Sequence, residues 1–218
     1  MLVEDYHLSF PFVVEHEGDF YMTTCSTAGT KAPYSLWLYK ATNFPRGWNK
    51  LVKILGDETL VGRAVDPVLH RHEGVWFLLT LDDGLQQERI FTSESLYGPF
   101  LEHPASKASW VRHAGGFLTD DYGVLYAFHQ YDATHVAAVP VLKISATEFQ
   151  YGVGFEILRP RDDLPWASAG MHTFNAQRLQ DGSWVAVADG WWRDNMLLRY
   201  RCLEANQDPC PVAPGDAP

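Results

Sequence analysis

The chain has 218 residues, of which 17 are basic and 27 are acidic, so its formal net charge is −10. This balance argues against a general binder of nucleic acid or of anionic membranes, because phosphate groups require a basic protein surface. The length is enough for one domain with a sizeable core. Eight Trp, ten Tyr and twelve Phe favour strands over helices.

The cysteines do not indicate a metal centre, and the sequence shows no membrane span or signal peptide. Its three cysteines, Cys25, Cys202 and Cys210, fit no C-x-x-C or Cys/His metal spacing, and we expect no cofactor. The sequence leaves open whether Cys202 and Cys210 form a disulfide. No apolar run approaches the roughly eighteen residues of a membrane span. We therefore expect a soluble protein, cytoplasmic if Met1 is the natural start, of undefined oligomeric state.

A glycine followed closely by an aromatic, hydrophobic strand occurs four times, at Gly18, Gly74, Gly123 and Gly182. The intervals of 56, 49 and 59 residues are too even for unrelated hairpins and too long for a helical repeat. Periods near 50 residues are typical of β-propellers, whose blades are small antiparallel sheets around a channel. The sequence thus predicts an all-β propeller with four countable blades, and a ligand site on the channel axis where the first strands begin.

Each repeat resembles a hairpin followed by outer strands, with Asp-Gly or Glu-Gly turns between the aromatic strands. In chain order, the predicted strands are 7–15, 20–24, 35–41 and 48–55; then 65–69, 75–81 and 89–93; then 110–118, 124–129 and 136–144; and finally 173–179, 183–188 and 196–201. We expect the propeller domain to cover residues 1–205. Residues 159–169 form a predicted loop over the channel, and the Pro-rich tail 206–218 is predicted to be disordered.

Aligning the repeats on their glycines places polar residues at the starts of the inner strands. Eight residues before the glycine stand Phe10, Asp66, Gly115 and Phe174. Six nearby side chains are expected to converge on one end of the channel: His7, Arg63, Asp66, Arg112, His113 and His172. Several of them could equally be loop residues that face solvent.

Asp66 is the sharpest candidate, because it lies in an Asp-Pro dipeptide at a strand start. Its carboxylate could accept a sugar hydroxyl, orient a water molecule or pair with an arginine, or it could simply satisfy turn amides. Arg63 and Arg112 suit an anionic or polyhydroxyl ligand, although plain ion pairing is the alternative. A metal site built from His7, His113 and His172 is open by residue type, but the spacing does not require one.

A second group of candidates follows the second strands of the third and fourth repeats. Carbohydrate sites pair aromatic faces with acids and amides, which makes Gln130, Asp189, Trp191 and Trp192 candidates for a sugar platform. Such tryptophans serve more often in core or blade-to-blade packing.

Several segments, taken in order, resemble a known module. They are HLSFPFVVEHEGDFYM, LWLYKATNFPRGW, AVDPVLHRHEGVWFLLT, SESLYGPFLEHP and RHAGG, with GMHTFNAQRLQDGSWVAVADG as a weaker extension. Their HLS-x-P, FP-x-x-W, VDP and LYGPF-x-x-HP elements resemble the N-terminal domain of plant glucosamine inositolphosphorylceramide transferases and their bacterial relatives. That domain is similar to the five-bladed propellers of glycoside hydrolase family 43. The resemblance implies this fold, with the blade before HLSFP absent.

The resemblance implies little about catalysis. In the plant proteins the sugar transfer is assigned to a separate C-terminal glycosyltransferase domain, for which this chain has no room. The propeller hydrolases use three acids at successive blade starts, and only Asp66 carries over, because Phe10 and Gly115 stand at the matching positions. A glycosidase needs two carboxyls across the bond, and Asp132 and Asp189 are the remaining catalytic candidates.

Three functions stay open. The first is a module that recognises a glycan or glycolipid head group, as an accessory to a glycosyltransferase. The second is an active glycoside hydrolase that uses Asp66, and the third is a protein-interaction scaffold. The missing acids favour recognition over hydrolysis, and the polar inner rim favours both over a scaffold. We expect a carbohydrate or glycolipid partner and no nucleic acid.

Overall fold

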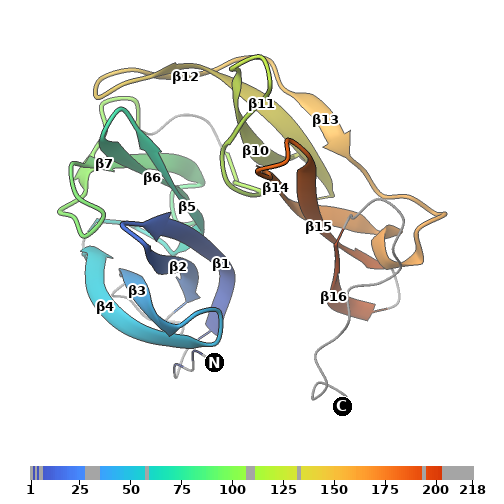
Figure 1. The fold of residues 1–218 in the computed structure, drawn as a ribbon, viewed down its shortest axis with the longest axis horizontal. Helices are drawn as coiled ribbons and strands as arrows, with labels where there is room; N and C mark the ends of the chain where they lie inside the picture. The colour runs from blue at the N-terminus through green and yellow to red at the C-terminus, as the bar shows by residue number, and fades with distance from the viewer. Residues whose placement is uncertain are drawn as a thin grey trace. The chain divides into compact units, whose positions relative to one another are not determined.

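The computed structural model describes residues 2, 4, 7–27, 35–56, 59–106, 111–131, 134–192 and 195–202. This part of the chain is all-β: antiparallel sheets joined by turns, with one 3-10 helix, η1 (Pro165–Ala167) (Figure 1). None of its helices is long and apolar enough to cross a membrane. The predicted tail 206–218 lies outside the described residues.

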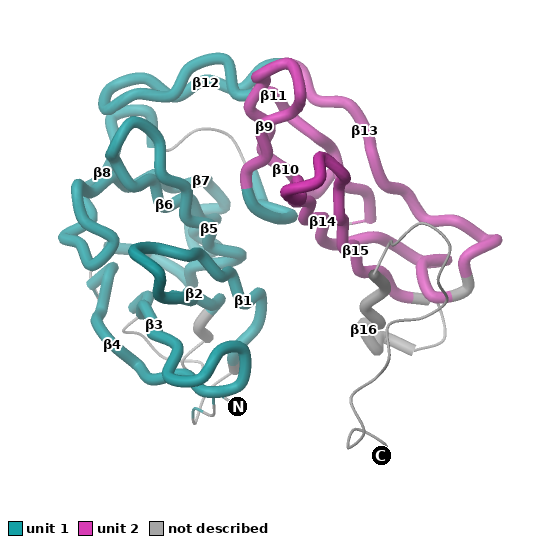
Figure 2. The backbone as a smooth tube through the Cα atoms, viewed as in Figure 1, with its two compact units in different colours: residues 1–116, 141–152 teal, residues 117–140, 153–218 magenta. Residues whose placement is uncertain are grey.

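The chain divides into two compact units (Figure 2). Unit 1 comprises residues 1–116 and 141–152, and unit 2 comprises residues 117–140 and 153–218. Each unit is described by itself below.

Unit 1 contains two four-stranded antiparallel sheets, each with its strands in chain order. The first sheet is formed by β1 (His7–His16), β2 (Asp19–Thr27), β3 (Leu36–Asn43) and β4 (Gly47–Leu55). The second is formed by β5 (Ala64–His72), β6 (Val75–Asp82), β7 (Gln87–Ser93) and β8 (Leu101–Glu102). These sheets match the first two predicted repeats, and a short strand, β12 (Phe149–Tyr151), also belongs to this unit.

The main hydrophobic core of unit 1 is formed by apolar side chains of both sheets. Burying each large apolar side chain contributes about 1.5–3 kcal/mol, so this cluster supplies most of the driving force for the unit. The cluster consists of Tyr21, Leu36, Leu38, Ile54, Leu55, Leu60, Ala64, Leu69, Trp76, Leu78, Phe91, Leu96 and Phe100. Strand β6 is buried along nearly its whole length, and β5 and β7 pair with its backbone on both sides.

Unit 2 contains the remaining strands. Its elements are β9 (Leu118–Thr119), β10 (Leu125–Tyr131), the first part of β11 (His135–Ile144), β13 (Phe155–Leu158), β14 (Gly170–Arg178), β15 (Trp184–Trp192) and β16 (Asn195–Cys202). Strands β14, β15 and β16 form a three-stranded antiparallel sheet. Strand β9 is two residues long, much shorter than the predicted strand 110–118, and the predicted loop 159–169 contains η1.

A β-bulge interrupts the inner strand of three sheets. In each, two consecutive residues face one residue of the second strand. The pairs are Phe10 and Pro11 opposite Thr24, Asp66 and Pro67 opposite Thr80, and His172 and Thr173 opposite Asp189. The bulges therefore mark equivalent positions in the three sheets.

These bulges correct the alignment of the repeats on their glycines. Two residues separate the paired ends of the β1–β2 and β5–β6 hairpins, whereas five separate Arg178 from Trp184. The longer loop moves the bulge two positions further from its glycine. The counterpart of Asp66 in the fourth repeat is thus His172, not Phe174.

Candidate functional site

Asp66 occupies the bulge of β5 in a left-handed backbone conformation, with φ of 49°. The residue is 2% exposed. The Arg112 side chain donates from Nε to Asp66 Oδ2 at 2.5 Å, forming an ion pair. A buried carboxylate needs such a partner, because an unpaired buried charge is costly. The side chain of Arg112 is 29% exposed, so the pair is accessible from solvent.

The thiol of Cys25 lies beside this ion pair. Cys25 is paired with Ser9 in the β1–β2 register, next to the bulge at Phe10, and it is buried. Burial, and after it the negative charge of Asp66, raises the pKa of the Cys25 thiol. The thiol is therefore held in its neutral, unreactive form.

His113, adjacent to Arg112 in the chain, is bound to a buried acid. Its Nε2 lies 3.0 Å from Glu88 Oε1, and both side chains are fully buried. The Tyr151 hydroxyl donates to the same Glu88 oxygen at 2.6 Å, and burial followed by the charge of Glu88 raises the pKa of Tyr151 well above its usual range. His113 was predicted to line a ligand site, but this imidazole is sealed from solvent. Its geometry suits it to fix the backbone that carries Arg112.

A third buried acid of unit 1, Asp82, has a structural role. Its carboxylate accepts hydrogen bonds from four backbone N–H groups, those of residues 61, 62, 84 and 85, and it also pairs with Arg89. Arg63, predicted to join the ligand site, instead binds Asp83 through its Nε and is half exposed. The sequence signals for Asp82 were weak, because its donors come from two separate loops.

The remaining candidates gather at the bulge of β14 in unit 2. Asp189 is 2% exposed and accepts hydrogen bonds from the backbone N–H and the hydroxyl of Thr173, at 2.5 and 2.8 Å. His172 Nδ1 lies 3.8 Å from the other Asp189 oxygen. Gln130 donates to the His172 carbonyl at 3.2 Å. Trp191 packs edge-on to the His172 ring and directly over Gly170.

The structure therefore brings the predicted residues together in two places, one in each unit. Asp66 and Arg112 form one group, and Gln130, His172, Asp189 and Trp191 form the other. Asp132 and the side chains of His7 and Trp192 lie outside the described residues. In the described part of the chain, no three His, Cys, Asp or Glu side chains are placed to hold a metal ion.

Comparison with protein families finds one match over nearly the whole chain. Residues 1–191 match the family described as glucosamine inositolphosphorylceramide transferase 1, N-terminal. The transferase of that name from rice (Oryza sativa subsp. japonica) is 33% identical over 207 residues, and the one from Arabidopsis thaliana is 31% identical over 209. The alignments cover 87% of this chain but only 26% of each relative, so the chain spans about a quarter of their length.

Solved structures show the same fold at low sequence identity. An endo-arabinase from Bacteroides thetaiotaomicron has a TM-score of 0.65 at 14% identity, covering 91% of this chain and 75% of its own. A GH43_1 enzyme from Xanthomonas citri in complex with xylotriose has a TM-score of 0.63 at 15% identity, covering 92% and 71%. The predicted family 43 propeller fold is thus confirmed, and at this identity the likeness concerns the fold alone.

Proposed function

Because the chain belongs to the family of glucosamine inositolphosphorylceramide transferase N-terminal domains, we propose that it is a carbohydrate-recognition module that binds a glycan or glycolipid head group without cleaving it. The observation that carries this proposal is the ion pair of buried Asp66 with partly exposed Arg112. A guanidinium fixed by a buried carboxylate presents rigid, planar donor geometry, which suits hydroxyl and phosphate oxygens.

The hydrogen bonds and ion pairs that the buried acids make support recognition over hydrolysis. Glycoside hydrolysis needs two carboxyls placed across the scissile bond, one as proton donor and one as base or nucleophile. In the described part of unit 1, Asp66 pairs with Arg112, Asp82 accepts hydrogen bonds from four amides, and Glu88 is sealed against His113 and Tyr151. In unit 2, Asp189 accepts hydrogen bonds from the backbone N–H and the hydroxyl of Thr173 in the bulge. Each of these carboxylates has a structural partner.

The name of the plant relatives suggests the first ligands to test. It contains glucosamine and inositolphosphorylceramide. We therefore infer that this chain recognises an amino sugar or an inositol phosphate, with Arg112 as the anion-binding group. A module of this kind would serve as an accessory to a glycosyltransferase.

The test measures binding of the full chain to a glycan panel that includes glucosamine and inositol phosphate. Removing one partner of a charge-assisted contact should weaken binding about tenfold or more, so Asp66→Asn and Arg112→Gln should each lose affinity. Glu148→Gln and Lys143→Gln are matched controls, because these residues form an exposed ion pair of the same unit. The controls should bind like the wild type.

Arg112→Lys guards against misfolding, because it keeps the charge and removes the planar fork. It should fold and still bind weakly. Unchanged binding in all three site variants would show that the ligand binds elsewhere. Aryl glycosides provide the second assay: turnover by the wild type that disappears in Asp66→Asn would instead establish the hydrolase function.

A further inference from the structure

Phe10 occupies the bulge of β1 in a left-handed backbone conformation, with φ of 49°, the same value as Asp66 in β5. The other described non-glycine residues with positive φ lie in turns, whereas these two lie inside strands. A bulky side chain rarely adopts this conformation, and a following proline restricts the backbone further. Backbone strain of this kind is concentrated at functional sites. Phe10 therefore holds the strained position that carries the site acid in the second sheet.

The main core of unit 1 does not account for the phenyl group of Phe10. Phe12 and Val14 of the same strand pack against that core, but Phe10 is not among its described members and is partly exposed. Thr24 lies opposite the bulge, and its buried hydroxyl makes no hydrogen bond with a described residue. The equivalent Thr80 hydroxyl donates to a backbone carbonyl of its own sheet. The bulge of β1 thus carries a ring and a hydroxyl for which the described residues show no structural role.

The bulge at Phe10 lies beside the pair of Asp66 and Arg112. Strands β1 and β2 both pack against β5 in unit 1 (Figure 1). The Cys25 thiol is within hydrogen-bonding reach of the Ser9 hydroxyl and of the Asp66 backbone. The charge of Arg112 also acts on this thiol. Because Ser9 directly precedes Phe10, a single thiol separates the start of the bulge from the site acid.

From this placement we propose that Phe10 supplies the stacking face of the carbohydrate site, so that a six-membered polyol ring lies on its phenyl group while hydroxyl or phosphate oxygens bind Arg112. The inference rests on the proposed function. The C–H groups of such a ring are apolar and gain from burial against an aromatic side chain. Binding sites combine an aromatic lining with a few convergent polar groups, and bulges re-aim side chains beside such sites. The ligand is thus a cyclic sugar or inositol derivative rather than a free anion.

The experiment titrates the full chain with inositol phosphate, glucosamine and inorganic phosphate in a calorimeter. Phe10→Asn removes the ring but keeps a residue that tolerates a left-handed backbone. It should bind each ring ligand of the wild type about tenfold or more weakly, because the apolar contact is lost, and leave the affinity for inorganic phosphate unchanged. Phe10→Tyr keeps the ring and should bind like the wild type. Arg112→Gln should weaken binding of inositol phosphate and of inorganic phosphate.

Urea unfolding of the same variants gives a readout that needs no ligand. Phe10→Asn should unfold at a urea concentration at least as high as the wild type does, because relief of backbone strain offsets the lost ring. A lower midpoint would show that the fold itself uses the phenyl group and would overturn the inference. Val13→Asn, at an exposed position of the same strand, is the matched control and should bind like the wild type.

The binding results separate this inference from the proposed function. Ring-ligand affinity that Arg112→Gln lowers but Phe10→Asn leaves unchanged would overturn the inference alone. An equal loss in Val13→Asn, weaker ring binding in Phe10→Tyr, or weaker phosphate binding in Phe10→Asn would also overturn it. A wild type that binds neither ring ligand would overturn the proposed function, and this inference with it.

Discussion

Unit 1 contains a half-buried histidine that the fold keeps neutral. His70 lies in β5, and burial, followed by the nearby charge of His72, lowers its pKa to about 4. In the unfolded chain the same imidazole takes up a proton near pH 6.5. Between these values the unfolded state binds more protons than the folded state. The free energy of unfolding is therefore highest above pH 6.5 and falls as the pH drops toward 4.

We expect the wild type to lose roughly 1–3 kcal/mol of stability between about pH 7 and about pH 4 through this group. His70→Gln, which cannot take up a proton, should lose less over the same range. The measurement is urea unfolding at a series of pH values. His135→Gln, a substitution of a partly exposed histidine in unit 2, serves as control and should keep the acid sensitivity of the wild type. Equal pH dependence in wild type and His70→Gln would contradict this account.

Single residues of the candidate site were predictable to different degrees. The Asp-Pro dipeptide and the repeat spacing were enough to single out Asp66 and Arg112, which the structure joins. The environment of His113 could not be predicted, because Glu88 lies 25 residues before it and Tyr151, which binds the same Glu88, lies 63 residues after Glu88. A buried acid in an apolar strand is a signal that something pairs with it, but the sequence does not say what.

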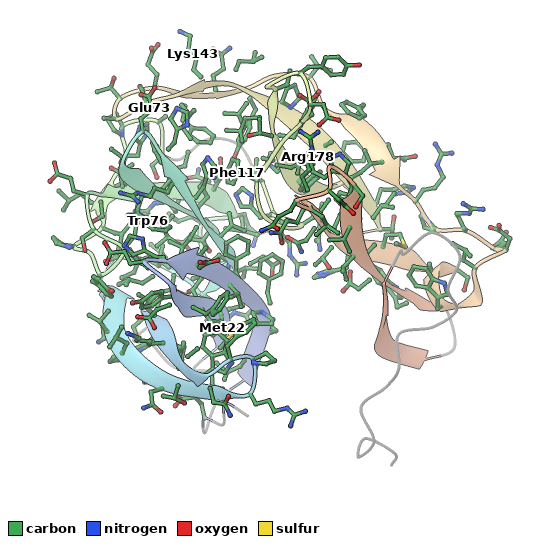
Figure 3. All side chains as sticks on the ribbon, in the orientation of Figure 1. Met22, Glu73, Trp76, Phe117, Lys143 and Arg178 are labelled. Carbon is green, nitrogen blue, oxygen red and sulfur yellow. The ribbon has the colours of Figure 1, made fainter. Side chains whose placement is uncertain are left out.

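At the scale of the elements, two hairpins turn through left-handed residues. Glu17 and Gly18 join β1 to β2 with φ of 54° and 82°, and Glu73 and Gly74 join β5 to β6 with φ of 47° and 87° (Figure 3 labels Glu73). Two-residue turns with positive φ at both positions match the right-handed twist of the strands and favour Asn-Gly. Glutamate at the first position is therefore strained.

Glu73→Asn should raise the free energy of unfolding by about 0.5–1 kcal/mol, because Asn tolerates the left-handed region better than Glu. The denaturation midpoint in urea, with an unchanged slope, measures the effect. Glu94→Asn is the matched control, an exposed glutamate in a bend without positive φ, and it should change stability little. A midpoint that falls in Glu73→Asn would show that the glutamate has a stabilising contact.

The hairpins also explain where prediction of the elements succeeded. Glycine-turn signals located the paired strands β1–β2, β5–β6 and β14–β15. They did not fix the bulges, because loop length varies between hairpins and a register shift of two residues leaves the apolar alternation unchanged. The counterpart of Asp66 in the fourth repeat was misplaced for this reason, at Phe174 instead of His172.

At the scale of the molecule, the main core cluster belongs to unit 1, and β6 runs through it. Its amides are paired on both sides and its side chains are almost all buried. Strand β14 of unit 2, by contrast, ends in exposed and half-exposed positions. Local opening that exposes an amide should therefore require more free energy in β6 than in β14.

Hydrogen exchange followed by mass spectrometry tests this difference. Peptides covering Val75–Asp82 should exchange slowest, and peptides covering Gly170–Arg178 should exchange faster. Leu78→Ala, in the core of unit 1, should speed exchange throughout that unit, since such substitutions cost about 2–5 kcal/mol. Equal protection of the two strands would mean that the units open together.

The whole-molecule fold was predictable because four repeats of similar length select one architecture. The division into two units was not, since Gly116, Pro140 and Gly152 stand at its boundaries but glycines and prolines also occur at turns and bulges inside the units. Strand β11 itself crosses one boundary, so the break falls inside a regular element. The hydrophobic pattern of a sequence indicates which side chains are buried, but it does not indicate which elements they pack against.

The bulges impose a compatibility rule on future substitutions. Pro11 and Pro67 have no backbone N–H, so the residue opposite needs no acceptor, and Thr80 turns its hydroxyl to the Val65 carbonyl instead. Thr173 has an N–H, and Asp189 accepts it. Residues 173 and 189 must therefore change as a couple. Thr173→Pro alone would remove the N–H and hydroxyl donors of the buried Asp189 carboxylate, and Asp189→Thr alone would remove the acceptor of the Thr173 amide. Only the double substitution would give this sheet the proline and threonine pair found at Pro67 and Thr80.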